Sequence, residues 1–136
     1  MTEERLQEIR KIFERYNKNK SEYRQLVVPT ISGVSYDKIA VVTDKSKNPT
    51  EQMIINYLID KERITREIEL VDKTYDFFAD ERNIEFAKLI DSRFRLGKHH
   101  WQAVNDCYIS DRQGLRWLDR VYEKAEEIGE RLHIFG

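Results

Sequence analysis

The amino-acid sequence predicts an all-α protein, and three observations support this fold class. Apolar residues recur at alternating spacings of three and four along two long segments, which is the period of a helix face. Residues that cap helices stand at the start of several segments. Charged residues make up 36% of the 136 residues, which suits a helix-rich chain with much solvated surface. No strand pattern of comparable strength competes with the helices.

The first helix is expected to begin immediately after Thr2. The Thr2 hydroxyl can act as the N-cap, and Glu3 and Glu4 place negative charge in the first turn, where the helix dipole favours it. A seam of regularly spaced residues, one of them charged, then predicts a packed face: Leu6, Ile9, Phe13, Tyr16, Lys20, Tyr23 and Val27.

Pro29 and Gly33 interrupt this pattern. We expect an extended connection over about residues 28–47, because no helical period is sustained there. The run Lys38–Val42 could form a short strand, but a lone strand has no partner nearby in the sequence. The connection is long enough for the chain to reverse its direction.

A second long helix is predicted from Pro49. Asn48 can act as its N-cap, proline suits the first helical position, and Glu51 can reach back to the N–H of the cap. The seam of this helix has the same spacing as the first: Ile54, Tyr57, Lys61, Ile64, Ile68, Val71, Tyr75 and Phe78. Such seams can pack against each other or against a second copy of the chain. Residues 1–78 are therefore interpreted as a helical portion for oligomerisation or partner contact.

Residues 79–136 are expected to form a separate domain of three to four helices. Asp80 is the expected N-cap of the first of them. The expected helices end near Gly97, run from about His99 to Cys107, and run from Ser110 to about Leu132. This order of a short helix, a tight connection and a longer helix is that of a helix-turn-helix.

The final helix is predicted to be amphipathic. With Leu115 as the origin and about 100° per residue, one arc of the helix is apolar. Its members are Leu115, Leu118, Tyr122, Ala125, Ile128 and Leu132. The opposite arc carries Arg112, Gln113, Arg116 and Arg120. The cationic face is therefore expected to lie outward.

The residue types on this outward face suit recognition of double-stranded DNA. Arginine can donate two hydrogen bonds to guanine or neutralise a phosphate, and glutamine can pair with adenine. Ser110 stands at the entry of the helix. Cations just before the short helix, which are Arg93, Arg95, Lys98, His99 and His100, are expected to hold phosphates and so set the register on DNA.

Other classes of function receive less support. The formal net charge is −1, so binding to nucleic acid must depend on a local patch. Asp119 and Glu123 could pair with the arginines and leave only a solvated helix face. Cys107 and the histidines lack the spacing of a metal site, so neither a metal nor a cofactor is expected. No catalytic motif indicates an enzyme. The single cysteine and the charged N-terminus favour a cytoplasmic protein.

Two stretches resemble the region-four helix-turn-helix of bacterial sigma factors: "RFRLGKHHWQAV" and "YISDRQGLRWLDRVYEKA". Over nearly the whole chain, including "NPTEQMIINYL", the order of motifs resembles the RinA and ArpU families of phage-encoded transcriptional regulators. Tyr108 stands at a turn position where such proteins often have glycine. Gly114 replaces a commonly buried aliphatic residue, which predicts a looser helix because glycine costs about 1 kcal/mol relative to alanine.

The resemblance implies an activator of phage late genes, such as packaging and morphogenesis operons. It implies binding to promoter DNA in the bacterial cytoplasm, with host RNA polymerase as a further partner. The DNA-binding residues that it implies are Ser110, Arg112, Gln113, Arg116 and Arg120, supported in the core by Trp101 and Ile109. The main alternative is a helical protein–protein interaction module that does not bind DNA. A small phage nuclease is a third possibility.

Overall fold

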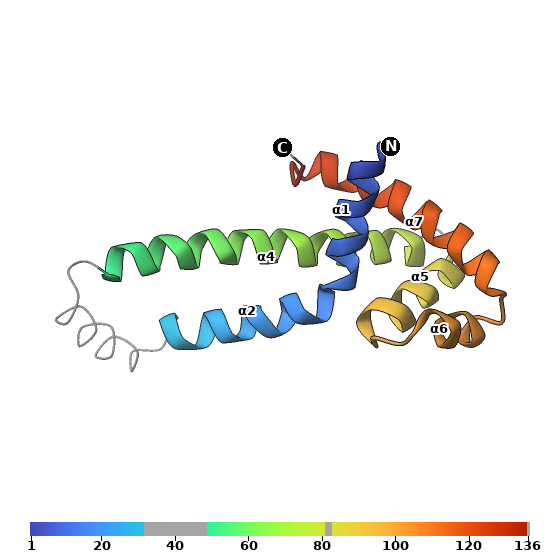
Figure 1. The fold of residues 1–136 in the computed structure, drawn as a ribbon, viewed down its shortest axis with the longest axis horizontal. Helices are drawn as coiled ribbons and strands as arrows, with labels where there is room; N and C mark the ends of the chain where they lie inside the picture. Colours follow the sequence, from blue (N-terminus) through green and yellow to red (C-terminus); the bar gives the residue numbers. More distant parts are fainter. Residues whose placement is uncertain (32–48, 81–82, 136) are drawn as a thin grey trace. The chain divides into compact units, whose positions relative to one another are not determined.

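A computed structural model describes residues 1–31, 49–80 and 83–135, and every regular element in these ranges is a helix (Figure 1). The all-α prediction is therefore confirmed for the described part of the chain. In order, the elements are α1 (Glu3–Glu14), α2 (Tyr16–Ile31), α4 (Pro49–Asp80), α5 (Ile84–Ile90), the π-helix η1 (Asp91–Arg95), α6 (His100–Asp106) and α7 (Asp111–Arg131).

The chain divides into two compact units. The first unit comprises Met1–Asn17 and Glu67–Gly136, and the second comprises Lys18–Arg66. This division differs from the expected boundary between residues 78 and 79. The reason is that α1 packs on α7, so the N-terminal helix shares a core with the C-terminal helices.

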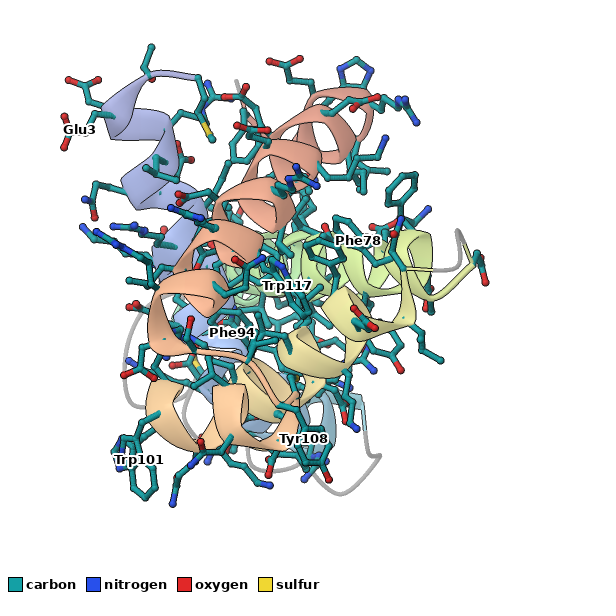
Figure 2. All side chains as sticks on the ribbon, turned by 90° about the vertical axis from the view of Figure 1, so that its right-hand side faces the viewer. Glu3, Phe78, Phe94, Trp101, Tyr108 and Trp117 are labelled. Atoms are coloured by element: carbon teal, nitrogen blue, oxygen red, sulfur yellow. The ribbon has the colours of Figure 1, made fainter. Side chains whose placement is uncertain are left out.

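Aromatic contacts hold the core of the first unit together. The Phe13 ring on α1 meets Phe94 and Tyr122 edge-on, at centroid distances of 5.2 and 5.5 Å. A second group runs from Phe78 through Phe86, 5.2 Å away, to Trp117, a further 4.8 Å away. Figure 2 shows Phe78, Phe94 and Trp117 inside the helix bundle. These contacts join α1, α4, α5, η1 and α7, which fixes the position of α7.

Two polar contacts near the end of α1 add to this packing. Arg15 donates through Nε and Nη2 to the two carboxylate oxygens of Glu67, each at 2.6 Å. The Tyr16 hydroxyl donates to Asp72 Oδ1 at 2.8 Å. The paired Glu67 is buried. A buried carboxylate needs such a partner, because an unpaired charge in the protein interior is costly.

In the second unit, α2 and the first half of α4 run antiparallel and side by side (Figure 1). Glu22 and Arg63 form an ion pair at 3.9 Å across them. Ile64 is buried as predicted, whereas Ile54, a member of the same predicted seam, is 50% exposed. The seam is therefore buried over only part of its length among the described residues.

Two expected helix boundaries differ from the observed ones. The helix α2 continues past Pro29 to Ile31, whereas an extended connection was expected from residue 28. Extending a formed helix costs less than starting one, so a single proline near the end does not set the boundary. Likewise Asp80 is the last residue of α4 and not the N-cap of the next helix, which is Asn83. Asn48 and residues 32–47, including the run Lys38–Val42, lie outside the described residues.

Candidate nucleic-acid interface

Helices α6 and α7 begin where the sequence predicts, because each has a capping interaction at its start. His99 is the N-cap residue of α6, and its backbone N–H donates to Gln102 Oε1 at 3.2 Å. Ser110 is the N-cap of α7, and its Oγ accepts from the backbone N–H of Gln113 at 3.1 Å. The Ser110 hydroxyl therefore has a structural role at the start of the candidate recognition helix.

A tight turn joins the two helices. Cys107 closes α6 by donating its N–H to the Ala103 carbonyl oxygen at 3.2 Å, and Ile109 donates to the Val104 carbonyl oxygen at 3.1 Å. Tyr108 between them has φ of 58°, in the left-handed region that favours glycine. The turn therefore has the tight geometry of a glycine turn although the residue is tyrosine.

Gly114 brings α6 and α7 into close contact. A Cβ atom built at Gly114 would collide with Val104 Cγ1 and would come within 3.0 Å of His100 Cε1. Both Gly114 and Val104 are buried. Gly114 therefore has a packing role besides its low helix propensity. An alanine here would require Val104 or His100 to shift, so glycine is the residue that allows this close approach.

His100 also connects the two helices. Its Nε2 lies 3.1 Å from the carbonyl oxygen of Asp111, and its Nδ1 is buried without a hydrogen-bond partner in the described part of the chain. The ring is half-buried against Gly114. His100 was expected to contact phosphate, but the structure places it between α6 and α7. His99, in contrast, is exposed.

The arginines of α7 are exposed, as predicted. Arg112, Arg116 and Arg120 form no hydrogen bond or ion pair with any residue that the structure describes. The acidic neighbours Asp119 and Glu123, which could have paired with them, do not do so. Gln113 is half-buried, because it lies at the border of the exposed face. Three guanidinium groups are thus presented to solvent along the first half of α7.

Leu115 is the main departure from the predicted face. It was placed in the apolar arc but is 53% exposed. The buried residues of α7 are instead Gly114, Leu118, Val121, Tyr122, Ala125, Ile128 and Gly129. The buried arc is centred on the side that faces α6 over Gly114, and Leu115 lies at the border between this arc and the arginine face.

The cations upstream of α6 are largely engaged within the protein. Lys98 Nζ donates to Asp106 Oδ2 at 2.6 Å. Arg95 donates to Asp72 at 2.8 Å and lies 3.9 Å from the centroid of the Tyr75 ring. Burial is the largest single influence and lowers the pKa of Arg95, but the hydrogen bond to Asp72 and the charges of Tyr16, Asp72 and Asp91 together outweigh it, so that the pKa is raised. The fold brings these acidic partners close, which the sequence pattern did not indicate.

Two aromatic side chains near this surface were not anticipated as exposed. Trp101, expected to support the core, is 57% exposed, and Tyr108 is 92% exposed. Figure 2 shows both projecting away from the helix bundle. The second expected support, Ile109, is half-buried against the core, as predicted. Trp101 is exposed because α6 turns Ala103 and Val104 toward the core. The sequence of this short helix does not indicate which of these residues faces inward.

No protein family, curated protein or solved structure matches the chain. In the described ranges, no three His, Cys, Asp or Glu side chains gather where they could hold a metal ion. Nor is any helix there both long enough and apolar enough to cross a membrane. Burial raises the pKa of the half-buried Cys107 thiol, which disfavours its reactive thiolate form. The exposure of Arg112, Arg116 and Arg120 makes the arginine face of α7 the candidate functional site.

Proposed function

We propose that this protein binds double-stranded DNA by placing the first half of α7 in the major groove. The observation that carries the proposal is the exposure of Arg112, Arg116 and Arg120 without any partner among the described residues. Guanidinium groups that already have carboxylate partners would have to break those pairs to bind DNA. These three need not do so, and all three remain available for phosphates or bases.

The spacing of the arginines suits a duplex. Arg112 and Arg120 are eight residues apart, which corresponds to about 12 Å along a helix at 1.5 Å per residue. This length matches about three to four base pairs at 3.4 Å each. Arginine in the first turns of a recognition helix donates two hydrogen bonds to guanine, the most common specific contact in the major groove. A face of this kind can therefore read a short sequence.

The proposed arrangement is that of a sigma region-four helix-turn-helix, with α6 crossing above α7. The tight turn at Tyr108 and the close packing at Gly114 support it, because they set the angle between the two helices. Of the expected upstream contacts, the exposed His99 is available for phosphate, whereas Lys98 would first have to leave Asp106.

For the biological role, we propose a phage-encoded transcriptional regulator, an activator of late packaging and morphogenesis genes. This role follows from the resemblance to the RinA and ArpU families, and it adds promoter DNA and host RNA polymerase as partners. Homo-oligomerisation through the N-terminal helices would let two copies bind adjacent half-sites. The bacterial cytoplasm is the compartment in which this role would be performed.

The proposal is tested by selecting duplexes from a random DNA library and measuring their affinity at several salt concentrations. Each phosphate neutralised should steepen the dependence of log K on log salt by about 0.9. Arg112→Ala and Arg116→Ala should each weaken binding to the selected site by about 1–3 kcal/mol if the side chain reads a base. Arg131→Ala is the matched control, because Arg131 is exposed on the same helix but pairs with Glu127.

Two results would contradict parts of the proposal. Equal losses on selected and random DNA would reduce the arginines to phosphate contacts. Failure to bind any duplex, even at low salt, would favour the alternative, in which α7 docks on an acidic protein partner.

A further inference from the structure

Leu115 is the one large apolar residue of α7 that is more than half exposed, and every residue of α7 is described. It belongs neither to the buried core nor to the partly buried residues that pack against it. Arg112 precedes it by three residues and Arg116 follows it immediately, and the exposed Asp111 and Asp119 stand four residues to either side. An apolar side chain is therefore presented to solvent near two guanidinium groups that have no partner among the described residues.

Helix geometry places these three side chains on one surface. At about 100° per residue, Leu115 lies about 60° around the helix from Arg112 and about 100° from Arg116. Around the axis of α7, Leu115 lies about 80° from the centre of the buried arc, which includes Val121, Leu118 and Ala125. Leu115 therefore stands at the edge of the arginine face, where it would enter a groove together with the arginines.

The chemistry of the major groove limits what this side chain can meet. An isobutyl group forms no hydrogen bond, so it gains only by covering another apolar group. The apolar group that an unmodified base pair presents in the major groove is the C5-methyl of thymine. We propose that Leu115 is a specificity-determining residue that contacts a thymine methyl next to the bases read by Arg112 and Arg116. This inference rests on the proposed DNA-binding function.

The test uses duplexes selected from a random library. Each thymine of the selected site is replaced singly by uracil, which removes only the methyl group. For the wild-type protein, one replacement should weaken binding about fourfold, which corresponds to about 0.8 kcal/mol for one buried methyl at 1.4 kcal/mol per tenfold. For Leu115→Ala, the same replacement should change the affinity by less than about 1.5-fold, since the apolar partner is gone.

Leu96→Ala is the matched control. Leu96 is 61% exposed and belongs to the same unit but lies outside α7. This variant should keep the fourfold difference between thymine and uracil. Because the methyl is removed from the DNA, the first measurement needs no variant and does not depend on how well a variant folds.

The outcomes separate the two proposals. If the protein selects a sequence with salt-dependent affinity but no uracil replacement weakens binding, the role of Leu115 is overturned and DNA binding stands. The same holds if Leu115→Ala keeps the difference between the two bases, or if no thymine occurs in the selected site. If no sequence is enriched and no duplex binds, both proposals fail.

Discussion

The backbone of Gly114 on α7 lies directly against the side chain of Val104 on α6, with no room for a Cβ atom between them. This contact sets the approach of the two helices that carry the candidate interface. It also explains why Leu115, the next residue along α7, is turned toward solvent. One close approach thus sets how α6 and α7 pack, with Leu115 about 100° further around α7 from the contact.

Gly114→Ala is expected to destabilise the protein by about 1–2 kcal/mol in urea unfolding. Overpacking costs about 1–3 kcal/mol, and the better helix propensity of alanine recovers part of that. Asp119→Ala, an exposed change on the same helix, should stay within about 0.5 kcal/mol of wild type. In a Val104→Ala background, Gly114→Ala should cost less than it does in the wild type, because the colliding methyl is gone. If Gly114→Ala proved stabilising, the close contact would be wrong.

Tyr108→Gly is expected to stabilise the protein by about 0.5–1 kcal/mol. The left-handed conformation costs a residue with a Cβ about 1–2 kcal/mol, and the greater freedom of glycine in the unfolded chain offsets part of the gain. Tyr108 is 92% exposed, so little packing is lost. Tyr108→Ala is the control, since alanine keeps the strain. Thermal unfolding that ranks alanine above glycine at this position would contradict the observed turn.

Arg15→Met is expected to lower the free energy of unfolding by about 2–3 kcal/mol. Removing one partner of a buried ion pair costs about 3–5 kcal/mol, and the partial exposure of Arg15 reduces the loss. Arg66→Met breaks the exposed pair with Glu62, so it should cost less than about 1 kcal/mol. Urea unfolding of both variants provides the comparison. Equal effects would mean that Glu67 is hydrated in solution.

Stability is expected to fall between pH 10 and 12 because of Tyr122. Burial raises the pKa of this tyrosine to about 12, although the Arg93 and Arg10 guanidinium groups oppose the shift. In this window the unfolded chain loses the proton and the folded protein keeps it. The unfolded state therefore binds fewer protons, and the free energy of unfolding falls by up to about 1.4 kcal/mol per pH unit.

Tyr122→Phe should remove this part of the pH dependence and leave the contact with Phe13 in place. Urea unfolding at pH 9 and pH 11.5 measures the difference between variant and wild type. Tyr108→Phe, which changes an exposed ring, should keep the wild-type dependence. An identical fall in stability for the wild type and Tyr122→Phe would show that other groups cause it.

Features that depend on neighbours within a few residues could be predicted well. The Thr2 and Ser110 caps, the start of α4 at Pro49 and the exposure of the α7 arginines all follow from local hydrogen bonding and helical period. Asp80 is an exception. Aspartate is a good N-cap, which predicted that a new helix starts there, but α4 continues to Asp80 and ends at it.

Features that depend on distant segments could not be predicted in this way. Arg95 was interpreted as a phosphate contact because it stands among the cations just before the short helix, yet in the fold it pairs with Asp72, which is 23 residues away, and with Asp91. Trp101 was assigned to the core by the resemblance to the regulator families, but α6 buries Ala103 and Val104 instead. In each case the deciding contact joins residues on different helices.

The sequence by itself determined that this chain forms capped, amphipathic helices and that α7 carries an arginine face, since both depend on the order of residues within a few turns. Only the tertiary structure decided that α1 belongs with the C-terminal helices, that Arg95 and Lys98 are paired, and that Leu115 joins the exposed face. The physical reason is that side-chain burial and ion pairing depend on which helices approach each other, and at Gly114 that approach is set by the absence of a single Cβ atom.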